Sequence, residues 1–199
     1  MTDTASTANT ANAANAANTG AAGPNDAEHP GIVQRGLWFE EYEEGARYLH
    51  RPGRTVTETD DVLFTTLTMN TQPLHLDAHW SSQQPGFGGK RLVNSMWTLS
   101  TVVGLSVSQL TLGTIVANLG FTEVSFPKPM FHGDTLYAET TCLSKRASKS
   151  RPGQGIVELE HIGRNQNGDI VCRAVRATLV QVDPASSGEA TLDDGTARS

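Results

Sequence analysis

The second half of the chain alternates between apolar and polar positions in a way that predicts long β-strands. This alternation is typical of strands with one buried face. We expect strands over residues 119–126, 135–145, 156–162 and 170–182. The run Asn165-Gln166-Asn167-Gly168-Asp169 joins the last two, and such an Asn/Gly-rich run is a strong signal for a tight hairpin turn. The pattern therefore indicates a series of consecutive antiparallel strands.

Residues 94–110 precede these strands and have an ambiguous pattern. Residues 105–109 alternate as in a strand, whereas Met96, Leu99 and Val103 recur at helical spacing. The polar residues of this segment are mostly serine and threonine, which suits an element that is buried on nearly all sides. Periodicity favours a helix only slightly. One buried helix followed by antiparallel strands defines an α+β architecture.

A second, shorter helix is predicted to begin at Thr57. The Thr57 hydroxyl can cap the helix, and Asp60 places a negative charge in its first turn. We interpret Glu58, Asp60 and Asp61 as cap and first-turn charges rather than as catalytic groups. A strand over residues 48–56, interrupted by a Pro-Gly pair, precedes the helix. The apolar face of the helix is expected to consist of Val62, Leu63, Phe64 and Leu67.

Both ends of the chain have a different composition from the middle. Residues 1–30 are dominated by Ala, Asn and Thr, and residues 184–199 are rich in small and polar side chains. Such segments bury too little apolar surface to offset the entropy that is lost on ordering. We therefore expect disordered tails at 1–30 and 184–199 and one folded domain over residues 31–183.

Composition and charge exclude several classes of function. The 199-residue chain has a net charge of -6 and a pI near 5.4, which argues against a nucleic-acid surface. It contains no apolar run long enough to span a bilayer and no secretory signal, so we expect no membrane partner and a cytoplasmic location. Cys142 and Cys172 are expected to be ordinary buried thiols. Neither a metal site nor a nucleotide-cofactor motif is recognisable.

A dense polar cluster follows the second helix. Within a few residues it contains Asn70, Gln72, His75 and Asp77. Such a cluster is costly to fold unless it stays solvated or takes part in chemistry. Pro73 disfavours a helical conformation at Gln72, so we expect an extended or turned loop that lets Asn70 and His75 point into a common cleft.

Several motifs in this order resemble the MaoC-like, R-specific enoyl-CoA hydratase family. The resemblance covers roughly residues 37–181. It implies a single hot-dog domain in which an antiparallel sheet wraps around a long central helix, and it assigns residues 94–110 to that helix. It also implies a homodimer or dimer-based oligomer with acyl-CoA sites at the subunit interface. The motifs are Pro73-Leu74-His75-Leu76-Asp77, Phe87-Gly88-Gly89, Phe126-Pro127-Lys128-Pro129-Met130, Gly133-Asp134-Thr135-Leu136 and Ser148-Lys149-Ser150-Arg151-Pro152.

The catalytic pattern of the family, Asp-x-Asn-Pro-x-His, is only partly present. Pro73 and His75 match, whereas Asn70 stands at the aspartate position and Gln72 at the asparagine position. Because an amide cannot accept a proton at neutral pH, the family's two-group activation of water cannot operate unchanged. Our hypothesis is that His75 is the base that takes a proton from water and returns it to the α-carbon, while Asn70 orients the water.

Each of these residues also has a structural interpretation. His75 can be a loop histidine that satisfies a backbone carbonyl, and Asn70 can be a turn-forming amide. We interpret Asp77 as an orienter of the loop, with a titrating catalytic role as the alternative. His79 and His132 are interpreted as structural.

The resemblance also implies where the substrate binds. Ser95 replaces the glycine that usually starts the central helix, but the helix N-terminus still presents N–H groups to an oxyanion. Gln72, Gly88 and Gly89 are expected to contact the substrate. Lys149 and Arg151 belong to the densest positive cluster of the chain and are expected to meet the phosphates of coenzyme A, unless the cluster is only a solvated basic stretch.

These features lead us to predict a hydro-lyase that reversibly adds water to a 2-enoyl-CoA. The run from Leu67 to Asp77 resembles relatives that handle branched or dicarboxylic substrates such as mesaconyl-CoA or itaconyl-CoA. No separate cofactor is expected, since coenzyme A is part of the substrate. The alternatives are a hot-dog acyl-CoA thioesterase and a non-catalytic acyl-CoA binding or partner subunit.

Overall fold

The computed structural model describes residues 32–186. The folded unit discussed below begins at Arg35. The expectation of disorder at residues 1–30, and for most of residues 184–199, lies outside the described part of the chain.

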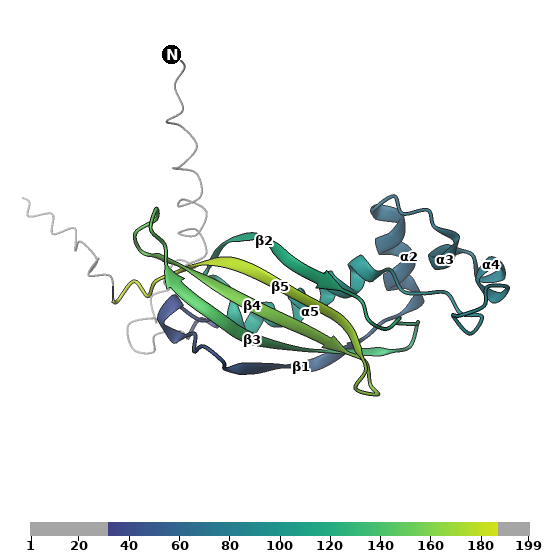
Figure 1. The fold of residues 1–199 in the computed structure, drawn as a ribbon, viewed down its shortest axis with the longest axis horizontal. Helices are drawn as coiled ribbons and strands as arrows, with labels where there is room; N and C mark the ends of the chain where they lie inside the picture. The colour runs from purple at the N-terminus through teal and green to yellow at the C-terminus, as the bar shows by residue number, and fades with distance from the viewer. Residues whose placement is uncertain (1–31, 187–199) are drawn as a thin grey trace, which may run out of the picture. The chain divides into compact units, whose positions relative to one another are not determined.

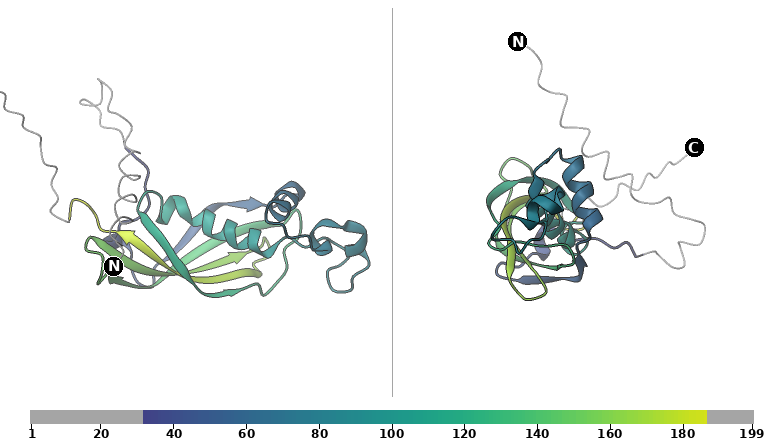
Figure 2. Two further views of the ribbon diagram at one scale, coloured as in Figure 1. Left: turned by 90° about the horizontal axis from the view of Figure 1, so that it is seen from above. Right: turned by 90° about the vertical axis from the view of Figure 1, so that its right-hand side faces the viewer.

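Five antiparallel strands form one sheet in the order β1-β3-β4-β5-β2. The sheet curves around the central helix α5 (Ser95–Leu110) (Figures 1 and 2). The expected α+β hot-dog fold is thus confirmed, and the ambiguous segment at 94–110 is a helix. The strands are β1 (Arg47–Thr55), β2 (Ile115–Ser125), β3 (Thr135–Ala147), β4 (Gln154–Arg164) and β5 (Ile170–Gln181).

The remaining helices are short. Figure 1 shows α2 (Glu58–Leu67), α3 (Pro73–Leu76) and α4 (Ala78–Ser82) together at one end of the unit, and the 3-10 turn η1 (Phe39–Glu41) precedes β1. The predicted cap of α2 is confirmed: Thr57 Oγ1 accepts the Asp60 N–H at 3.2 Å, and Asp60 Oδ2 accepts the Thr57 N–H at 2.9 Å. None of the helices within residues 32–186 is long and apolar enough to cross a membrane.

The predicted apolar face of α2 is only partly confirmed, because Phe64 packs against the core but the two leucines do not. Leu63 and Leu67 are 56% and 75% exposed, whereas the buried positions of the helix are Asp61 and Thr65. Asp61 is therefore more than a first-turn charge. The helix directs a carboxylate and a hydroxyl inward because both find hydrogen-bond partners there, as described for the site below.

Two further differences concern local conformation. The polar cluster was expected to be extended or turned; Gln72 is indeed extended, but Pro73 occupies the first position of the one-turn helix α3, where its missing N–H has no cost. The strand β2 begins at Ile115 rather than near residue 119, because its first residues pair with the end of β5 around Val180.

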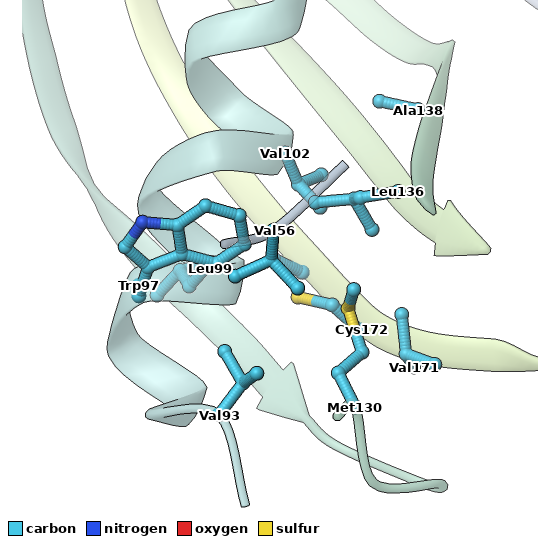
Figure 3. Packing of buried hydrophobic residues seen from close by; sticks show 11 residues of the cluster. Val56, Val93, Trp97, Leu99, Val102, Met130, Leu136, Ala138, Val171 and Cys172 are labelled. Carbon is cyan, nitrogen blue, oxygen red and sulfur yellow. The ribbon is translucent and has the colours of Figure 1, made fainter. Parts of the chain in front are cut away.

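The core between α5 and the sheet consists of two apolar clusters. The first surrounds the N-terminal half of α5 and includes Trp97 and Val102 (Figure 3). The second surrounds Leu110 and includes Tyr42 and Leu159. Both cysteines are free and buried, as expected.

A buried polar chain crosses the inner face of the sheet. Arg176 Nε donates to His161 Nε2 at 2.8 Å, and Thr140 Oγ1 lies 2.7 Å from both His161 Nδ1 and His50 Nε2. His50 Nδ1 in turn lies 2.8 Å from Gln109 Oε1 on α5. Burial, with a contribution from the Arg176 charge, lowers the pKa of His161 to about 3. Arginine only donates, so Nε2 of a neutral His161 accepts and its Nδ1 donates to Thr140. Every hydrogen bond of the chain is then donated in the same direction, from Arg176 toward Gln109.

Candidate active site

The candidate site is built around the N-terminus of α5. Asn94 is the N-cap: its Oδ1 accepts the Met96 N–H at 3.0 Å, and its backbone oxygen accepts the Thr98 N–H at 3.2 Å. The N–H of Ser95 has no hydrogen-bond partner within the described residues. It lies at the positive end of a 16-residue helix and can therefore donate to a negatively charged oxygen.

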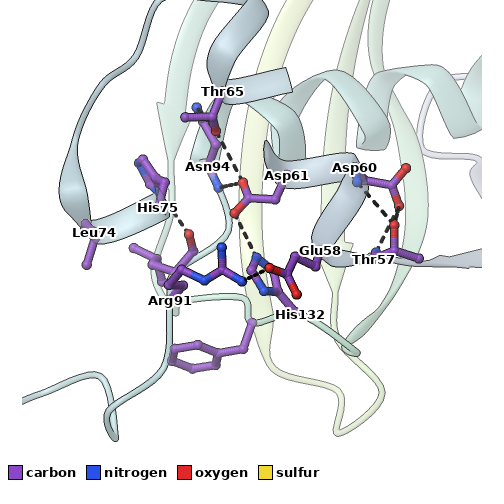
Figure 4. A network of polar contacts seen from close by, with 12 residues as sticks. Thr57, Glu58, Asp60, Asp61, Thr65, Leu74, His75, Arg91, Asn94 and His132 are labelled. Atoms are coloured by element: carbon purple, nitrogen blue, oxygen red, sulfur yellow. Dashed lines mark hydrogen bonds and ion pairs between the residues drawn. The ribbon is translucent and has the colours of Figure 1, made fainter. Parts of the chain in front are cut away.

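Asp61 on α2 holds this N-terminus from behind. The carboxylate is completely buried, and its Oδ1 accepts the Asn94 N–H at 2.8 Å (Figure 4). Its Oδ2 lies 2.8 Å from His132 Nε2, so each carboxylate oxygen has a strong partner. Thr65, one turn further along α2, accepts a hydrogen bond from the Asn94 side chain at 3.2 Å. A buried carboxylate is tolerable only with such compensation.

His75 on α3 is tied to the segment that enters α5. Its ring is 8% exposed, and its Nδ1 lies 2.8 Å from the backbone oxygen of Leu92. Because a carbonyl oxygen only accepts, Nδ1 carries the hydrogen, and in the neutral ring Nε2 then carries the lone pair. The same two segments are also linked by the Leu92 N–H, which donates to the Leu74 oxygen at 3.1 Å. His75 thus makes the backbone contact of the structural interpretation, and this contact leaves Nε2 available as a base.

Asn70 lies in the turn between α2 and α3. It follows Met69, which has a positive φ of 58°, and its side-chain oxygen accepts the Gln72 N–H at 3.3 Å. This is the contact of a turn-forming amide. The amide nitrogen of Asn70 has no partner within residues 32–186, so it can still donate to a water molecule. Gln72 is exposed and makes no side-chain cap to α3.

Asp77 has a local structural contact. It is exposed and caps α4 by accepting the Trp80 N–H at 2.8 Å. This contact supports its interpretation as an orienter of the loop. His79, on α4, is exposed, and its ring nitrogen Nε2 lies 3.0 Å from the Gln83 side chain.

A mainly apolar cavity of about 200 Å³ lies beside the N-terminus of α5. Gly88 and Gly89, which both have positive φ, follow the lining residue Phe87 and allow the loop to turn there. Lys128 is the only lining residue with a charge, and it forms an ion pair with Asp169 at 2.5 Å. The lining residues are Phe87, Leu92, Val93, Ser95, Thr98, Phe126, Lys128, Pro129, Met130 and Val171.

Lys149 and Arg151 are not brought to this site within one chain. Both are exposed in the hairpin between β3 and β4, at the opposite end of the sheet from α3 (Figure 1). Since β3 has 13 residues, the hairpin lies on the order of 40 Å along the strand from the turn at residues 130–134. Contact between these cations and a ligand held by His75 would require a second subunit.

Sequence reasoning missed the partners behind the helix N-terminus. Asp61 was assigned to the first turn of a helix, His132 to a structural role without a partner, and Asn94 to no role. The available signal was an unusual density of acids at residues 58–61, of which local capping uses only Asp60. By contrast, both cysteines are buried, as expected of ordinary core thiols, and burial raises the pKa of Cys172 to about 11.

Comparison with known proteins assigns this geometry to a family. A family model described as "MaoC like domain" matches residues 40–165, which is more than half of the chain. The chain belongs to the MaoC-like domain family. A solved MaoC-like dehydratase from Rhodospirillum rubrum is 30% identical, with a TM-score of 0.66 over 75% of this chain and 99% of that structure.

Two curated relatives carry more specific names. A mesaconyl-CoA hydratase from Cereibacter sphaeroides is 31% identical over 151 residues, 73% of this chain and 41% of the relative. A β-methylmalyl-CoA dehydratase from Chloroflexus aurantiacus is 28% identical over 159 residues, 79% of this chain and 44% of the relative. The chain thus spans less than half the length of these two relatives.

Proposed function

We propose that this MaoC-like chain is a hydratase that reversibly adds water to an α,β-unsaturated acyl-CoA thioester. The observation that carries the proposal is the tautomer of His75. Its Nδ1 is committed to the Leu92 carbonyl at 2.8 Å, which leaves the lone pair on Nε2, and Leu92 lies three residues before Ser95, whose N–H is open. A base for water and a donor for an oxyanion are the two requirements of this reaction.

The proposed reaction needs one proton acceptor. His75 Nε2 takes a proton from water while the water oxygen forms a bond to the β-carbon, and the electron pair of the double bond moves toward the thioester oxygen. The Ser95 N–H stabilises the resulting enolate. His75 then returns the proton to the α-carbon, and the reverse sequence is dehydration. The amide of Asn70, with its free nitrogen, orients the water but cannot accept its proton.

We further propose a branched or dicarboxylic acyl group, of the kind in mesaconyl-CoA or itaconyl-CoA. The support is the pair of relatives named for mesaconyl-CoA and β-methylmalyl-CoA, together with a cavity of only about 200 Å³, which suits a short acyl group better than a long chain.

We also propose that the functional unit contains two hot-dog domains. β2 is an edge strand that pairs only with β5, and residues 118–124 are all exposed. An exposed edge with apolar side chains such as Leu119 and Phe121 is a ready surface for pairing with a second strand. Such a pairing would also supply cations from a second chain for the phosphates of coenzyme A.

Two alternatives make different predictions. A thioesterase of this fold would need a reachable carboxylate in or near the helix, but α5 contains no acidic residue and Asp61 is fully buried. A non-catalytic acyl-CoA binding subunit is suggested by the amide at position 70. Asn70→Asp distinguishes the hydratase from the non-catalytic binding subunit. An enzyme adapted to the amide should lose rate or change substrate, whereas a binding subunit should stay inactive or gain activity.

The direct test is turnover by the full chain. We would incubate it with crotonyl-CoA, mesaconyl-CoA and itaconyl-CoA, follow the enoyl-thioester absorbance, and identify the products by mass spectrometry. Gain of one water on at least one substrate is expected. Release of free coenzyme A would assign a thioesterase instead, and binding without turnover would assign a non-catalytic member.

A further inference from the structure

The helix α2 presents its polar residues to the protein interior. Its buried side chains are Asp61 and Thr65, while Leu63 and Leu67 are exposed. An apolar inner face would have tied α2 to the core with less desolvation cost. The carboxylate at position 61 therefore requires an explanation beyond holding a helix in place.

One oxygen of Asp61 holds Asn94, the N-cap of α5. Asp61 Oδ1 accepts the N–H of Asn94, and the side chain of Asn94 is held at both ends, by Thr65 Oγ1 at 3.2 Å and by the Met96 N–H at 3.0 Å. With the Asn94 oxygen bonded to the Thr98 N–H, every polar group of this residue is engaged. The unpartnered N–H of Ser95 shares its peptide plane with the Asn94 carbonyl, so Asp61 helps to set its direction by fixing Asn94.

The second oxygen of Asp61 links this peptide to a separate loop. His132 Nε2 lies 2.8 Å from Oδ2, and the ring is only 19% exposed. The loop of His132 is itself fixed, because the Met130 oxygen accepts the Val93 N–H at 2.9 Å and the Gly133 N–H donates to the Val56 oxygen at 2.9 Å. A carboxylate can accept at both positions, whereas an amide of the same shape can accept at only one.

We propose that Asp61 is a positioning residue of the hydration site, which acts through Asn94 and His132 to aim the Ser95 N–H at the developing enolate oxygen. This inference rests on the proposed function. Asp61 touches no reacting atom, because it is fully buried behind the helix N-terminus. Its contribution should therefore appear in the rate of the chemical step and not in substrate binding.

Asp61→Asn and Asp60→Asn form a matched pair for the test. Both remove one negative charge from the first turn of α2, but only Asp61 contacts the α5 N-terminus, whereas Asp60 contacts Thr57 and Arg54 at the surface. For Asp61→Asn we expect kcat to fall about tenfold to a hundredfold with KM changed less than about threefold, a part of the loss seen when an oxyanion donor is removed. For Asp60→Asn we expect kcat within about twofold of wild type.

His132 variants test the same link without removing the carboxylate. His132→Ala deletes the donor to Asp61 Oδ2, whereas His132→Gln keeps an N–H at a similar reach. We expect the alanine variant to lose kcat and the glutamine variant to recover most of it. The Met96 N–H is bonded to Asn94 Oδ1, so its hydrogen exchange should be faster in Asp61→Asn and unchanged in Asp60→Asn, which reports the positioning independently of activity.

The outcomes separate the two proposals. An inactive wild-type protein overturns the proposed hydratase function, and the inference with it. An active wild type with Asp61→Asn at an unchanged kcat overturns only the positioning role. If Asp61→Asn does not fold, the two His132 variants decide. A kcat of His132→Ala equal to that of wild type overturns the inference. A loss of kcat in His132→Ala that His132→Gln recovers supports it.

Discussion

The two ends of α5 are held in different ways. At its C-terminus, the Tyr42 hydroxyl donates to the Leu110 oxygen at 2.6 Å inside an apolar cluster. The hydrogen-bonded chain from Gln109 to Arg176 then runs across four strands of the sheet. At its N-terminus, the contacts come from short helices and turns, and they include the charged Asp61.

This difference indicates that the contacts at the C-terminal end of α5 serve stability and those at its N-terminal end serve function. Polar groups that are set by strand register are positioned by the whole sheet, so their loss should cost stability. Polar groups on loops around a helix N-terminus leave an N–H and a histidine nitrogen without partners in the described part of the chain, which is the arrangement of a reactive site. Variants at the N-terminal end should therefore change rate, and variants at the C-terminal end should change the free energy of unfolding.

The largest expected effect is at His75. His75→Ala removes the proposed base, so we expect kcat for hydration to fall by about a hundredfold to ten-thousandfold. His79→Ala is the matched control, because this histidine lies four residues away on an exposed surface. Steady-state kinetics on both variants, with circular dichroism to confirm folding, gives the comparison. Full activity in His75→Ala would remove His75 from the mechanism.

The second effect concerns the other end of α5. His161→Leu leaves the Arg176 Nε–H and the Thr140 hydroxyl without their buried partner, so we expect a loss of about 2–5 kcal/mol in the free energy of unfolding. Urea titration measures this loss. The variant should keep kcat within about twofold of wild type where it is folded. A large loss of rate without loss of stability would contradict the separation of the two ends.

The third effect is acid sensitivity from the same histidine. Its pKa falls from 6.5 in the unfolded chain to about 3 when buried. Below pH 6.5 the unfolded chain binds a proton on this histidine that the folded protein does not bind. The free energy of unfolding is therefore fully retained above pH 6.5 and decreases as the pH falls from 6.5 toward 3. Between about pH 7 and pH 5 we expect a loss of about 2 kcal/mol. Denaturant titration at both pH values should show it in wild type and a smaller loss in His161→Leu.

The smallest effects are on the surface of α2. Asp60→Ala removes the reciprocal cap with Thr57 and should cost about 1 kcal/mol of stability. Leu67→Ala should cost less than about 0.5 kcal/mol, since this side chain is 75% exposed. A loss of 2 kcal/mol or more at Leu67, measured by thermal or urea unfolding, would show that the residue is covered by a partner.

Local chemistry explains what could be predicted. The hairpin at Asn165–Asp169 and the cap at Thr57 depend on residues within five positions of one another, and both formed as expected. The place of α5 inside an antiparallel sheet followed from the family resemblance, because periodicity alone left residues 94–110 ambiguous.

Long-range partners explain what could not be predicted. The inward orientation of Asp61 depends on Asn94 and His132, which lie 33 and 71 residues away in the sequence. A pattern of apolar residues assumes that leucines face the core, and on α2 that assumption failed. The chain from His50 to Arg176 also gave no signal, since each of its members is a single polar residue on a different strand.

Turnover of mesaconyl-CoA in oxygen-18-labelled water tests the central claim most directly. If His75 and the N-terminus of α5 form a hydration site, the label should appear in a new hydroxyl group of a product that is still an intact thioester, and His75→Ala should form almost none of it. Label in the carboxylate of a released acid, together with free coenzyme A, would contradict the claim and assign attack at the thioester carbonyl.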